Sequence, residues 1–286
     1  MKKKRLLVLS DSWPSSSHTI RAANSVIFEL LNEFVKHENI DVGFLKFNNP
    51  AASGEVSLGE KKGVTMLEKK GVKILESLSF PPRKPISKWR HFLKLFNPRM
   101  EDWYPEIIYH NMIEKKIFEF PPDIIFIPWS EWITALCSEI KIPKFAYYGN
   151  PDPKVGFFRS YFSYRQHDVN FLNFLRLKYL MHCLEKLHLK VMKKYEILGD
   201  VALNDANYYT EKGHANAFYI QNLWVDRFGT SWKEKRKEYE KDEPAIIVAN
   251  IGKVFATANQ YGLEMLGRDF LPELKKRLHG QLFEIH

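Results

Sequence analysis

Short apolar runs alternate with helical spacing along the first fifty residues. An apolar run at residues 5–10 ends at a polar loop of residues 11–19. Apolar side chains then recur at helical spacing from Val26 to Val35, with Asn24 as the expected N-cap. A second apolar run follows at residues 41–47. Strand, loop, helix and strand in this order predict the opening of a doubly wound parallel sheet.

The same rhythm continues to about residue 220. Residues 48–75 are polar and predict an exposed loop with some helix. Beyond them, strands are expected at residues 123–129, 143–148, 200–203 and 217–220, and helices at residues 131–140, 167–195 and 204–213. This alternation predicts an α/β fold built on a Rossmann-like, doubly wound parallel sheet.

A polar segment divides the chain. Residues 229–243 are almost entirely polar and predict a linker after a first domain of residues 1–228. The pattern then restarts, with strands expected at residues 245–249 and 281–286 and a helix at residues 259–278. Since a parallel sheet cannot stop at its second strand with both faces covered, residues 244–286 are expected to be the beginning of a second Rossmann-like domain, incomplete here.

Composition narrows the class of protein. The 286 residues are 45% hydrophobic and 27% charged, which is typical of a folded globular chain. No apolar run approaches the roughly 18 residues that cross a bilayer, and the apolar stretch after the N-terminal lysines is too short for a secretory signal. Two cysteines, Cys137 and Cys183, make a disulfide framework or a zinc site improbable. We therefore expect a cytoplasmic protein.

The net charge of +9 is concentrated in two segments. Residues 81–99 carry six Lys and Arg and no acid, and residues 158–194 carry eight Lys and Arg against Asp168 and Glu185. Aromatic residues interrupt both segments. Such surfaces suit an anionic partner, either acidic lipid headgroups or nucleic acid. The alternative is that both are ordinary solvated faces.

The order of segments resembles the group 1 (family 4) glycosyltransferases, which have the two-domain GT-B fold. Five stretches carry the resemblance: residues 10–24, the Pro-Asp strand at 122–126, the Ile-Pro strand at 142–146, Tyr219-Ile-Gln-Asn-Leu-Trp-Val-Asp226, and residues 259–274. The last resembles the first helix of the family's nucleotide-binding domain. The likeness covers nearly the whole chain.

The resemblance implies transfer of a sugar from a nucleotide-sugar donor to a hydroxyl acceptor, such as a polysaccharide, a lipopolysaccharide or a lipid-linked glycan. It also implies retention of configuration, no catalytic metal and no cofactor beyond the nucleotide sugar. The first domain would bind the acceptor, and the basic segments would hold it peripherally at the inner face of a membrane. The family's donor-binding glutamates would lie beyond residue 286, so the 286-residue piece is expected to be inactive alone.

Candidate site residues follow from the fold, because open parallel sheets bind ligands at the carboxyl ends of their strands. The loop after the first strand offers hydroxyls, helix N-terminal amides and a guanidinium for phosphate or sugar. Its candidates are Ser12, Ser16, Ser17, His18 and Arg21. His18 is a donor or a base near neutral pH, or else a solvated loop residue. For Arg21 a simple salt bridge is the alternative.

Two later loops supply the other candidates. Trp129 and Glu131 pair an aromatic face with a carboxylate, as sugar sites do, although Glu131 also suits a helix N-terminus. The following strand ends in a stretch that either approaches an acceptor hydroxyl or forms an ordinary turn, with candidates Tyr148, Gly149, Asn150 and Asp152. The catalytic residue is undetermined, with His18 and Glu131 as candidates. His182 and His188 do not share a helix face, and we expect no metal site.

Other functions are disfavoured or left as alternatives. The chain has no Gly-x-Gly-x-x-Gly after its first strand, no P-loop and no Gly-x-Ser-x-Gly elbow. A nucleic-acid-binding α/β protein could use the basic segments, but it gives the restarted strand–helix unit no role, and we expect no nucleic-acid partner. A non-catalytic sugar-binding module on the same fold is the remaining alternative.

Overall fold

The computed structural model describes residues 3–16, 22–48, 56–81, 89, 94–148, 151–221, 246–248, 257–278 and 283–285. The chain divides into two compact units, residues 1–156 with 177–224 and residues 157–176 with 225–286. The predicted linker at residues 229–243 lies outside the described residues. The domain boundaries at residues 228 and 244 stay predictions.

The first unit is built on an eight-stranded sheet whose described pairings are all parallel. Its strands are β1 (Lys4–Ser10), β2 (Ile40–Asn48), β3 (Lys73–Ile74), β4 (Leu78–Ser79), β5 (Ile124–Pro128), β6 (Lys144–Tyr148), β7 (Ile197–Asp200) and β8 (Ala217–Tyr219). The order is β3-β2-β1-β5-β6-β7-β8, and β4 pairs with β2. The predicted doubly wound parallel sheet is confirmed.

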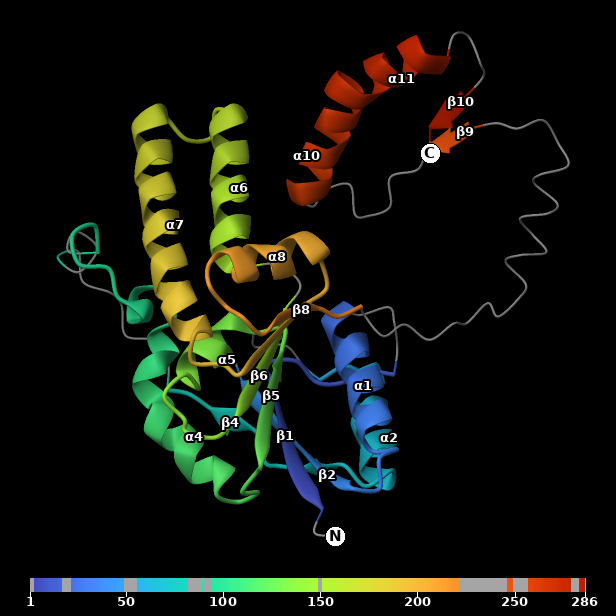
Figure 1. Cartoon of the computed structure of the whole chain (residues 1–286), viewed down its shortest axis with the longest axis vertical. Helices are drawn as coiled ribbons and strands as arrows, with labels where there is room; N and C mark the ends of the chain where they lie inside the picture. The colour runs from blue at the N-terminus through green and yellow to red at the C-terminus, as the bar shows by residue number, and fades with distance from the viewer. Residues whose placement is uncertain are drawn as a thin grey trace, which may run out of the picture. The chain divides into compact units, whose positions relative to one another are not determined.

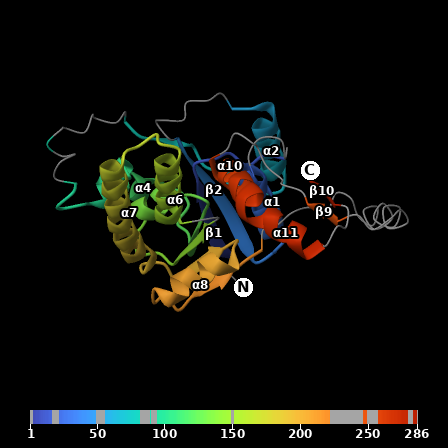
Figure 2. The ribbon, with the colours of Figure 1, turned by 90° about the horizontal axis from the view of Figure 1, so that it is seen from above.

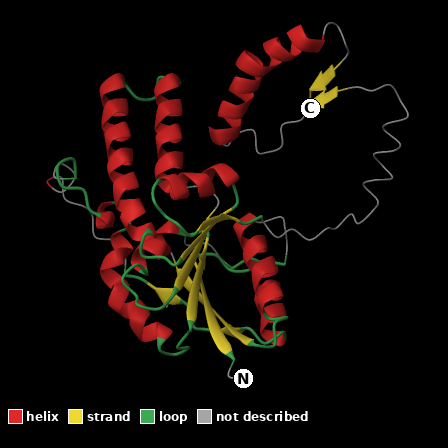
Figure 3. Ribbon diagram, viewed as in Figure 1, coloured by secondary structure: helices red, strands yellow, loops and turns green. Residues whose placement is uncertain are grey.

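Helices cover both faces of this sheet (Figure 1; Figure 3). The helical elements are α1 (Ala22–Phe34), α2 (Leu58–Lys69), the 3₁₀ turns η1 (Met100–Asp102) and η2 (Pro105–Tyr109), α4 (His110–Ile117), α5 (Glu131–Leu136), α6 (Asp152–Arg165), α7 (Phe171–Met192) and α8 (Leu203–Glu211). Helices α1 and α2 lie on one side of the sheet and α4 on the other (Figure 1).

Side chains along β1 point alternately to the two faces of the sheet and pack into two separate hydrophobic clusters. Leu7 and Leu9 pack in a cluster with residues of α4, α5 and the end of α7, including Ile113. Val8 points the other way and packs in a cluster with residues of α1 and α2, including Leu31. Each of these side chains is at most 1% exposed, and full burial of one such side chain stabilises the fold by about 1.5–3 kcal/mol. The period of two along the strand thus fixes helices on both faces.

Helices α6 and α7 stand side by side as a hairpin (Figure 1; Figure 2). Near its tip the rings of Tyr164 and Phe174 stack with centroids 4.8 Å apart. Helix α7 lies within the bounds of the helix predicted at residues 167–195 and confirms it, whereas the sequence did not predict α6. Helix α6 begins at Asp152 with Pro153 as its second residue. Proline is tolerated there because the first helical turn needs no intrahelical donor.

Strand β7 is displaced from its prediction. The sequence predicted a strand at residues 200–203, whereas β7 spans Ile197–Asp200 and α8 begins at Leu203. Gly199 explains the shift, because a Cβ there would lie 2.7 Å from the Ile220 side chain and 3.0 Å from Phe145. The strand therefore packs closely at Gly199, but glycine has no side chain and does not add to the apolar pattern from which strands are predicted.

The second unit contains a parallel pair of strands and a long helical segment. The strands are β9 (Ile246–Val248) and β10 (Phe283–Ile285), and the helical segment comprises α10 (Thr257–Met265), a π-helical turn (Leu266–Phe270) and α11 (Leu271–Leu278). The strands pair with Phe283 opposite Ile246. These elements match the predicted strand, helix and strand. Across the described residues of both units, no helix combines the length and apolarity needed to span a membrane.

Candidate functional site

The strand order reverses between β1 and β5. These neighbours are connected through β2, β3 and β4 on one side, while β6, β7 and β8 continue on the other. In open parallel sheets this switch point leaves a crevice at the carboxyl ends of the strands, where ligands bind. The segments that leave the sheet here are residues 11–16 after β1 and residues 129–131 after β5. Residues 151–152 follow β6, the next strand.

Asp11 joins the loops after β1 and β5. Its Oδ2 accepts hydrogen bonds from Ser130 Oγ at 3.1 Å and from Trp132 Nε1 at 2.8 Å. Its Oδ1 accepts one from Ser12 Oγ at 3.2 Å. Asp11 is therefore held in place by three neutral donors, and the candidate Ser12 lies at the switch point as predicted from its place after the first strand.

The rest of the first loop rests on α2. The Ser15 amide donates to the Asn24 carbonyl at 3.0 Å, which ties the loop to α1. A Cβ on Gly63 would lie 2.6 Å from the Pro14 carbonyl oxygen and 3.0 Å from the Ser16 amide nitrogen, so α2 approaches the loop closely only because residue 63 is glycine. Ser16 is half-buried at this contact. The candidates Ser17, His18 and Arg21 lie outside the described residues.

Trp129 turns the chain out of β5. Its φ of 58° is in the left-handed region that bulky residues rarely adopt. Its amide donates to the Tyr147 carbonyl at 2.6 Å, and its ring meets the Tyr147 ring edge-on at 6.4 Å. The buried indole Nε1 has no hydrogen-bond partner among the described residues. Backbone strain of this kind clusters at active sites, ligand clamps and switch regions, which makes Trp129 a candidate for a functional position.

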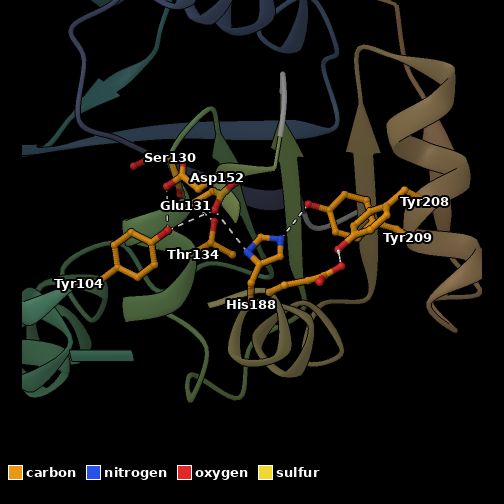
Figure 4. A network of polar contacts seen from close by, with 9 residues as sticks. Tyr104, Ser130, Glu131, Thr134, Asp152, His188, Tyr208 and Tyr209 are labelled. Atoms are coloured by element: carbon orange, nitrogen blue, oxygen red, sulfur yellow. Dashed lines mark hydrogen bonds and ion pairs between the residues drawn. The ribbon is translucent and has the colours of Figure 1, made fainter. Parts of the chain in front are cut away.

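Glu131 is buried below the carboxyl ends of the strands and is not exposed there. The side chain is 5% exposed, and Figure 4 shows it between Tyr104, Asp152 and His188. Its Oε1 accepts a hydrogen bond from the Asp152 amide. Its Oε2 lies 3.2 Å from the Tyr104 hydroxyl and 3.3 Å from His188 Nδ1. This placement favours a supporting role for Glu131 over direct contact with a sugar, which stays a prediction.

Asp152 is the exposed member of this network. It is the first residue of α6, and its Oδ2 accepts a 2.7 Å hydrogen bond from the buried Tyr104 hydroxyl. Since Glu131 holds the Asp152 amide from below, both the backbone and the carboxylate of Asp152 are fixed. A fixed, exposed carboxylate is suited to accept hydrogen bonds from ligand hydroxyls.

His188 closes the network from α7. The ring is 1% exposed, and its Nε2 lies 2.8 Å from the Tyr209 hydroxyl. Burial lowers the pKa of His188 to about 4, so the imidazole is neutral near pH 7. With its proton on Nδ1, the ring donates to Glu131 and accepts from Tyr209. The contact with Glu131 is then a hydrogen bond from a neutral ring rather than an ion pair.

Burial also sets the protonation of the other members. Burial, followed by the charge of Asp152, raises the pKa of Glu131 well above its ordinary value. Burial and the neighbouring carboxylates likewise raise the pKa of Tyr104, so its hydroxyl keeps its proton and donates. The raised pKa of Glu131 favours its neutral, protonated form in the folded chain.

The remaining candidates of this loop are placed differently. Tyr148 is 1% exposed, and its ring lies in the core 6.4 Å from the His188 ring. Contact with an acceptor would require an exposed side chain, so the geometry gives Tyr148 a packing role instead. The candidates Gly149 and Asn150 lie outside the described residues.

A second acidic group lies at the carboxyl end of β7. Asp200 is 1% exposed, its Oδ1 accepts a 2.9 Å hydrogen bond from the Ala202 amide, and burial raises its pKa to about 7. Its Oδ2 has no hydrogen-bond partner among the described residues. Nearby, the Lys154 ammonium of α6 pairs with the buried Asp205 carboxylate. Among the described residues, no three His, Cys, Asp or Glu side chains are grouped to hold a metal ion.

The sequence brought some of these residues to notice and missed others. Asp11 directly follows the first strand, so the carboxyl-end principle could have selected it with Ser12. Tyr104 and His188 gave no usable signal. Tyr104 lies between the 3₁₀ turns η1 and η2, and His188 lies near the C-terminal end of α7. Only the packing of these elements brings both to Glu131.

No family model matches the chain, and no curated protein matches it in sequence. Solved structures with a similar fold include LpCGTa in complex with UDP, at 11% identity over 99% of this chain and 70% of that chain, with a TM-score of 0.44. UDP-GlcNAc 2-epimerase from Neisseria meningitidis bound to UDP-GlcNAc is similar at 15% identity over 99% and 64%, with a TM-score of 0.44.

A third similar structure is Medicago truncatula UGT71G1 complexed with UDP-glucose, at 10% identity over 93% of this chain and 65% of that chain, with a TM-score of 0.41. This chain thus spans between 64% and 70% of the length of the three structures. Identities and TM-scores at this level assign no function.

Proposed function

We propose that the chain is part of an enzyme that transfers a glycosyl group from a nucleotide sugar to a hydroxyl of an acceptor. In this proposal the unit of residues 1–156 and 177–224 binds the acceptor at the switch point between β1 and β5. The observation that carries it is the exposed Asp152 carboxylate, fixed by Tyr104 and Glu131 at the carboxyl edge of the sheet.

The chemistry of this edge suits a sugar. A carboxylate accepts hydrogen bonds from adjacent hydroxyls, and indole rings offer apolar faces to the C–H groups of a sugar ring. Two partly buried indoles, Trp13 and Trp129, follow β1 and β5, the strands on either side of the switch point. Asp152 follows the next strand, β6. Asp152 would orient the acceptor hydroxyl that reacts.

In the proposed reaction the acceptor oxygen forms a bond to the anomeric carbon of the donor sugar. The bond from that carbon to the phosphate oxygen breaks, and its electron pair leaves with the nucleoside diphosphate. The proton of the acceptor hydroxyl passes to the departing diphosphate. Asp152 contributes by holding the hydroxyl in line, since correct placement of reacting groups supplies a large share of enzymatic acceleration.

The donor half of the proposal rests on the sequence resemblance. The stretches at residues 219–226 and 259–274 resemble the group 1 glycosyltransferases, and from them we propose a GT-B enzyme, retention of configuration and transfer without a catalytic metal. The same resemblance supports a polysaccharide or lipid-linked acceptor. A chelator should then leave the rate of transfer unchanged.

Peripheral attachment to an anionic membrane belongs to the same proposal. The basic segment of residues 158–194 covers most of α6 and α7, which expose Phe158, Phe171 and Leu172 by 50%, 55% and 75%. Apolar side chains beside lysine and arginine suit the interface of an anionic bilayer. Most of the other basic segment, residues 81–99, lies outside the described residues.

Acceptor binding can be tested without the donor. Saturation-transfer NMR with a panel of mono- and oligosaccharides should detect binding by the chain, and Asp152→Asn should weaken it. Asp41→Asn is the matched control, because Asp41 is half-exposed at the opposite end of the sheet and pairs with Lys3. Equal binding by both variants would contradict the role of Asp152.

Transfer itself is measured as release of nucleoside diphosphate from a panel of nucleotide sugars in the presence of the selected acceptor. Sugar binding with no turnover of any nucleotide sugar would favour the non-catalytic sugar-binding module. Release of diphosphate that depends on the acceptor would support the transferase.

A further inference from the structure

Lys46 is a half-buried cation at the carboxyl edge. It lies near the end of β2, opposite Ser10, the last residue of β1. Burial lowers the pKa of Lys46 below its ordinary value. No carboxylate among the described residues lies within ion-pair distance of its ammonium. A cation withdrawn from water without a counterion is costly, so this position calls for a negative partner.

The ammonium is held in one place by a built set of contacts. Lys46 Nζ donates to Asn48 Oδ1. Asn48 Nδ2 in turn donates to Ser77 Oγ at 3.2 Å and to Ser79 Oγ at 2.8 Å, so both amide hydrogens are used and Oδ1 must face the lysine. Lys46 Nζ also lies 5.4 Å from the centroid of the Trp13 ring. These contacts orient the ammonium without neutralising it.

The nearest acidic side chains do not form an ion pair with Lys46. Asp11 and Glu60 both act on its charge from a distance. Asp11 is already held by Ser130 Oγ and Trp132 Nε1. Glu60 Oε2 accepts the Ser57 amide at 2.8 Å in the capping box of α2, and its Oε1 accepts Asn24 Nδ2 at 2.9 Å. Both carboxylates are thus engaged by neutral donors.

We propose that Lys46, oriented by Asn48 beside Trp13, binds an anionic group of the acceptor, either a carboxylate or a phosphate. This inference rests on the proposed function, which identifies the bound molecule as the acceptor. It adds the substrate class, which is an acidic or phosphorylated sugar rather than a neutral one. Lys154, the other lysine described near this edge, differs because Asp205 neutralises it.

The test compares matched ligands by calorimetry. Glucose, glucuronate and glucose 6-phosphate are titrated into the wild-type chain, Lys46→Gln, Lys46→Arg and the control Lys36→Gln, whose lysine is exposed and pairs with Glu33. At least one of the two anionic sugars should bind about tenfold more tightly than glucose. Lys46→Gln should lose that preference, and Lys46→Arg and Lys36→Gln should keep most of it.

A preference for glucose 6-phosphate identifies a phosphate group, and one for glucuronate identifies a carboxylate. Equal binding of all three sugars overturns the inference.

A second readout uses the wild-type chain and inorganic phosphate. Lysines are labelled by reductive ¹³C-methylation, and the Lys46 signal is assigned by its loss in Lys46→Gln. Phosphate should raise the pKa of Lys46, because an anion stabilises the ammonium, and leave Lys36 unchanged. If phosphate leaves the pKa of Lys46 unchanged while neutral sugars bind, the anion site is wrong and the proposed function is not affected. If phosphate raises this pKa but no nucleotide sugar is turned over, the transferase proposal is wrong and the anion site stands.

Discussion

The hydroxyl of Tyr104 donates a 2.7 Å hydrogen bond to Asp152, a residue 48 positions later in the chain. The same hydroxyl lies 3.2 Å from Glu131 Oε2. Tyr104 comes from the short turn before η2, Glu131 from the start of α5 and Asp152 from the start of α6. One buried phenol thus joins two carboxylates that follow neighbouring strands, and the more exposed of the two faces the carboxyl edge.

Tyr104→Phe should remove this bridge while keeping the ring in its packing. Because a hydrogen bond to a charged group contributes about 1.5–3 kcal/mol, we expect a comparable fall in the free energy of unfolding, measured by urea denaturation, together with weaker acceptor binding. Tyr219→Phe is the control, since Tyr219 is 51% exposed at the edge strand β8. If the two variants lose equal stability, Tyr104 does not hold the carboxylates.

His188→Leu should destabilise the chain far more than His182→Leu on the same helix. His188 is buried between Glu131 and Tyr209, and its loss leaves two buried polar groups without their partner. We expect a loss of about 2–5 kcal/mol in the free energy of unfolding. The His182 side chain is 56% exposed, and its replacement should cost less than about 0.5 kcal/mol.

Asp200 should make stability depend on pH between about 4 and 7. Burial raises its pKa in the folded chain to about 7, above the ordinary aspartate value of 3.8. The unfolded carboxyl therefore releases its proton first as the pH rises, and the stability that Asp200 contributes below pH 4 is lost on the way to pH 7. Asp200→Asn cannot ionise and keeps the oxygen that accepts the Ala202 amide.

The measurement compares urea denaturation of wild type and Asp200→Asn at pH 5 and pH 8. The variant should gain on the order of 3 kcal/mol relative to wild type between these two values, from a shift of about three pKa units. A stability difference that does not change with pH would show that Asp200 ionises normally in the folded chain.

Charge on the helical hairpin should determine binding to anionic vesicles. Replacing Arg159, Arg176 and Lys178 by glutamine should weaken sedimentation with phosphatidylserine vesicles by about a hundredfold, at roughly 1 kcal/mol per charge. Removing the six charges of residues 81–99 should abolish binding to these vesicles. Neutral phosphatidylcholine vesicles should bind neither wild type nor variant.

The control replaces three exposed lysines of the first unit, Lys36, Lys61 and Lys62, which changes the net charge equally. Equal losses in the two triple variants would mean that binding follows net charge, and the hairpin would then be an ordinary solvated face.

The sequence by itself determined the central strands of the sheet and their parallel direction, but not the short strands β3 and β4. Periodicity is local, and the runs at residues 5–10, 41–47, 123–129 and 143–148 each predicted a strand that the structure contains. The carboxyl-end principle then placed Ser12, Trp129 and Asp152 at one edge without any knowledge of packing. Strand β7 was misplaced because Gly199 packs tightly yet adds nothing to an apolar pattern.

Only the tertiary structure decided which side chains act together. Tyr104 reaches Glu131 from the short stretch before η2 and His188 from the C-terminal part of α7, and neither position differs in sequence from ordinary core residues. The sequence does not show which side chains are buried, and in the folded chain Glu131 is buried while Asp152 is exposed. Lys46 is also left half-buried without a counterion, because contacts and solvation depend on segments that meet only after the chain has folded.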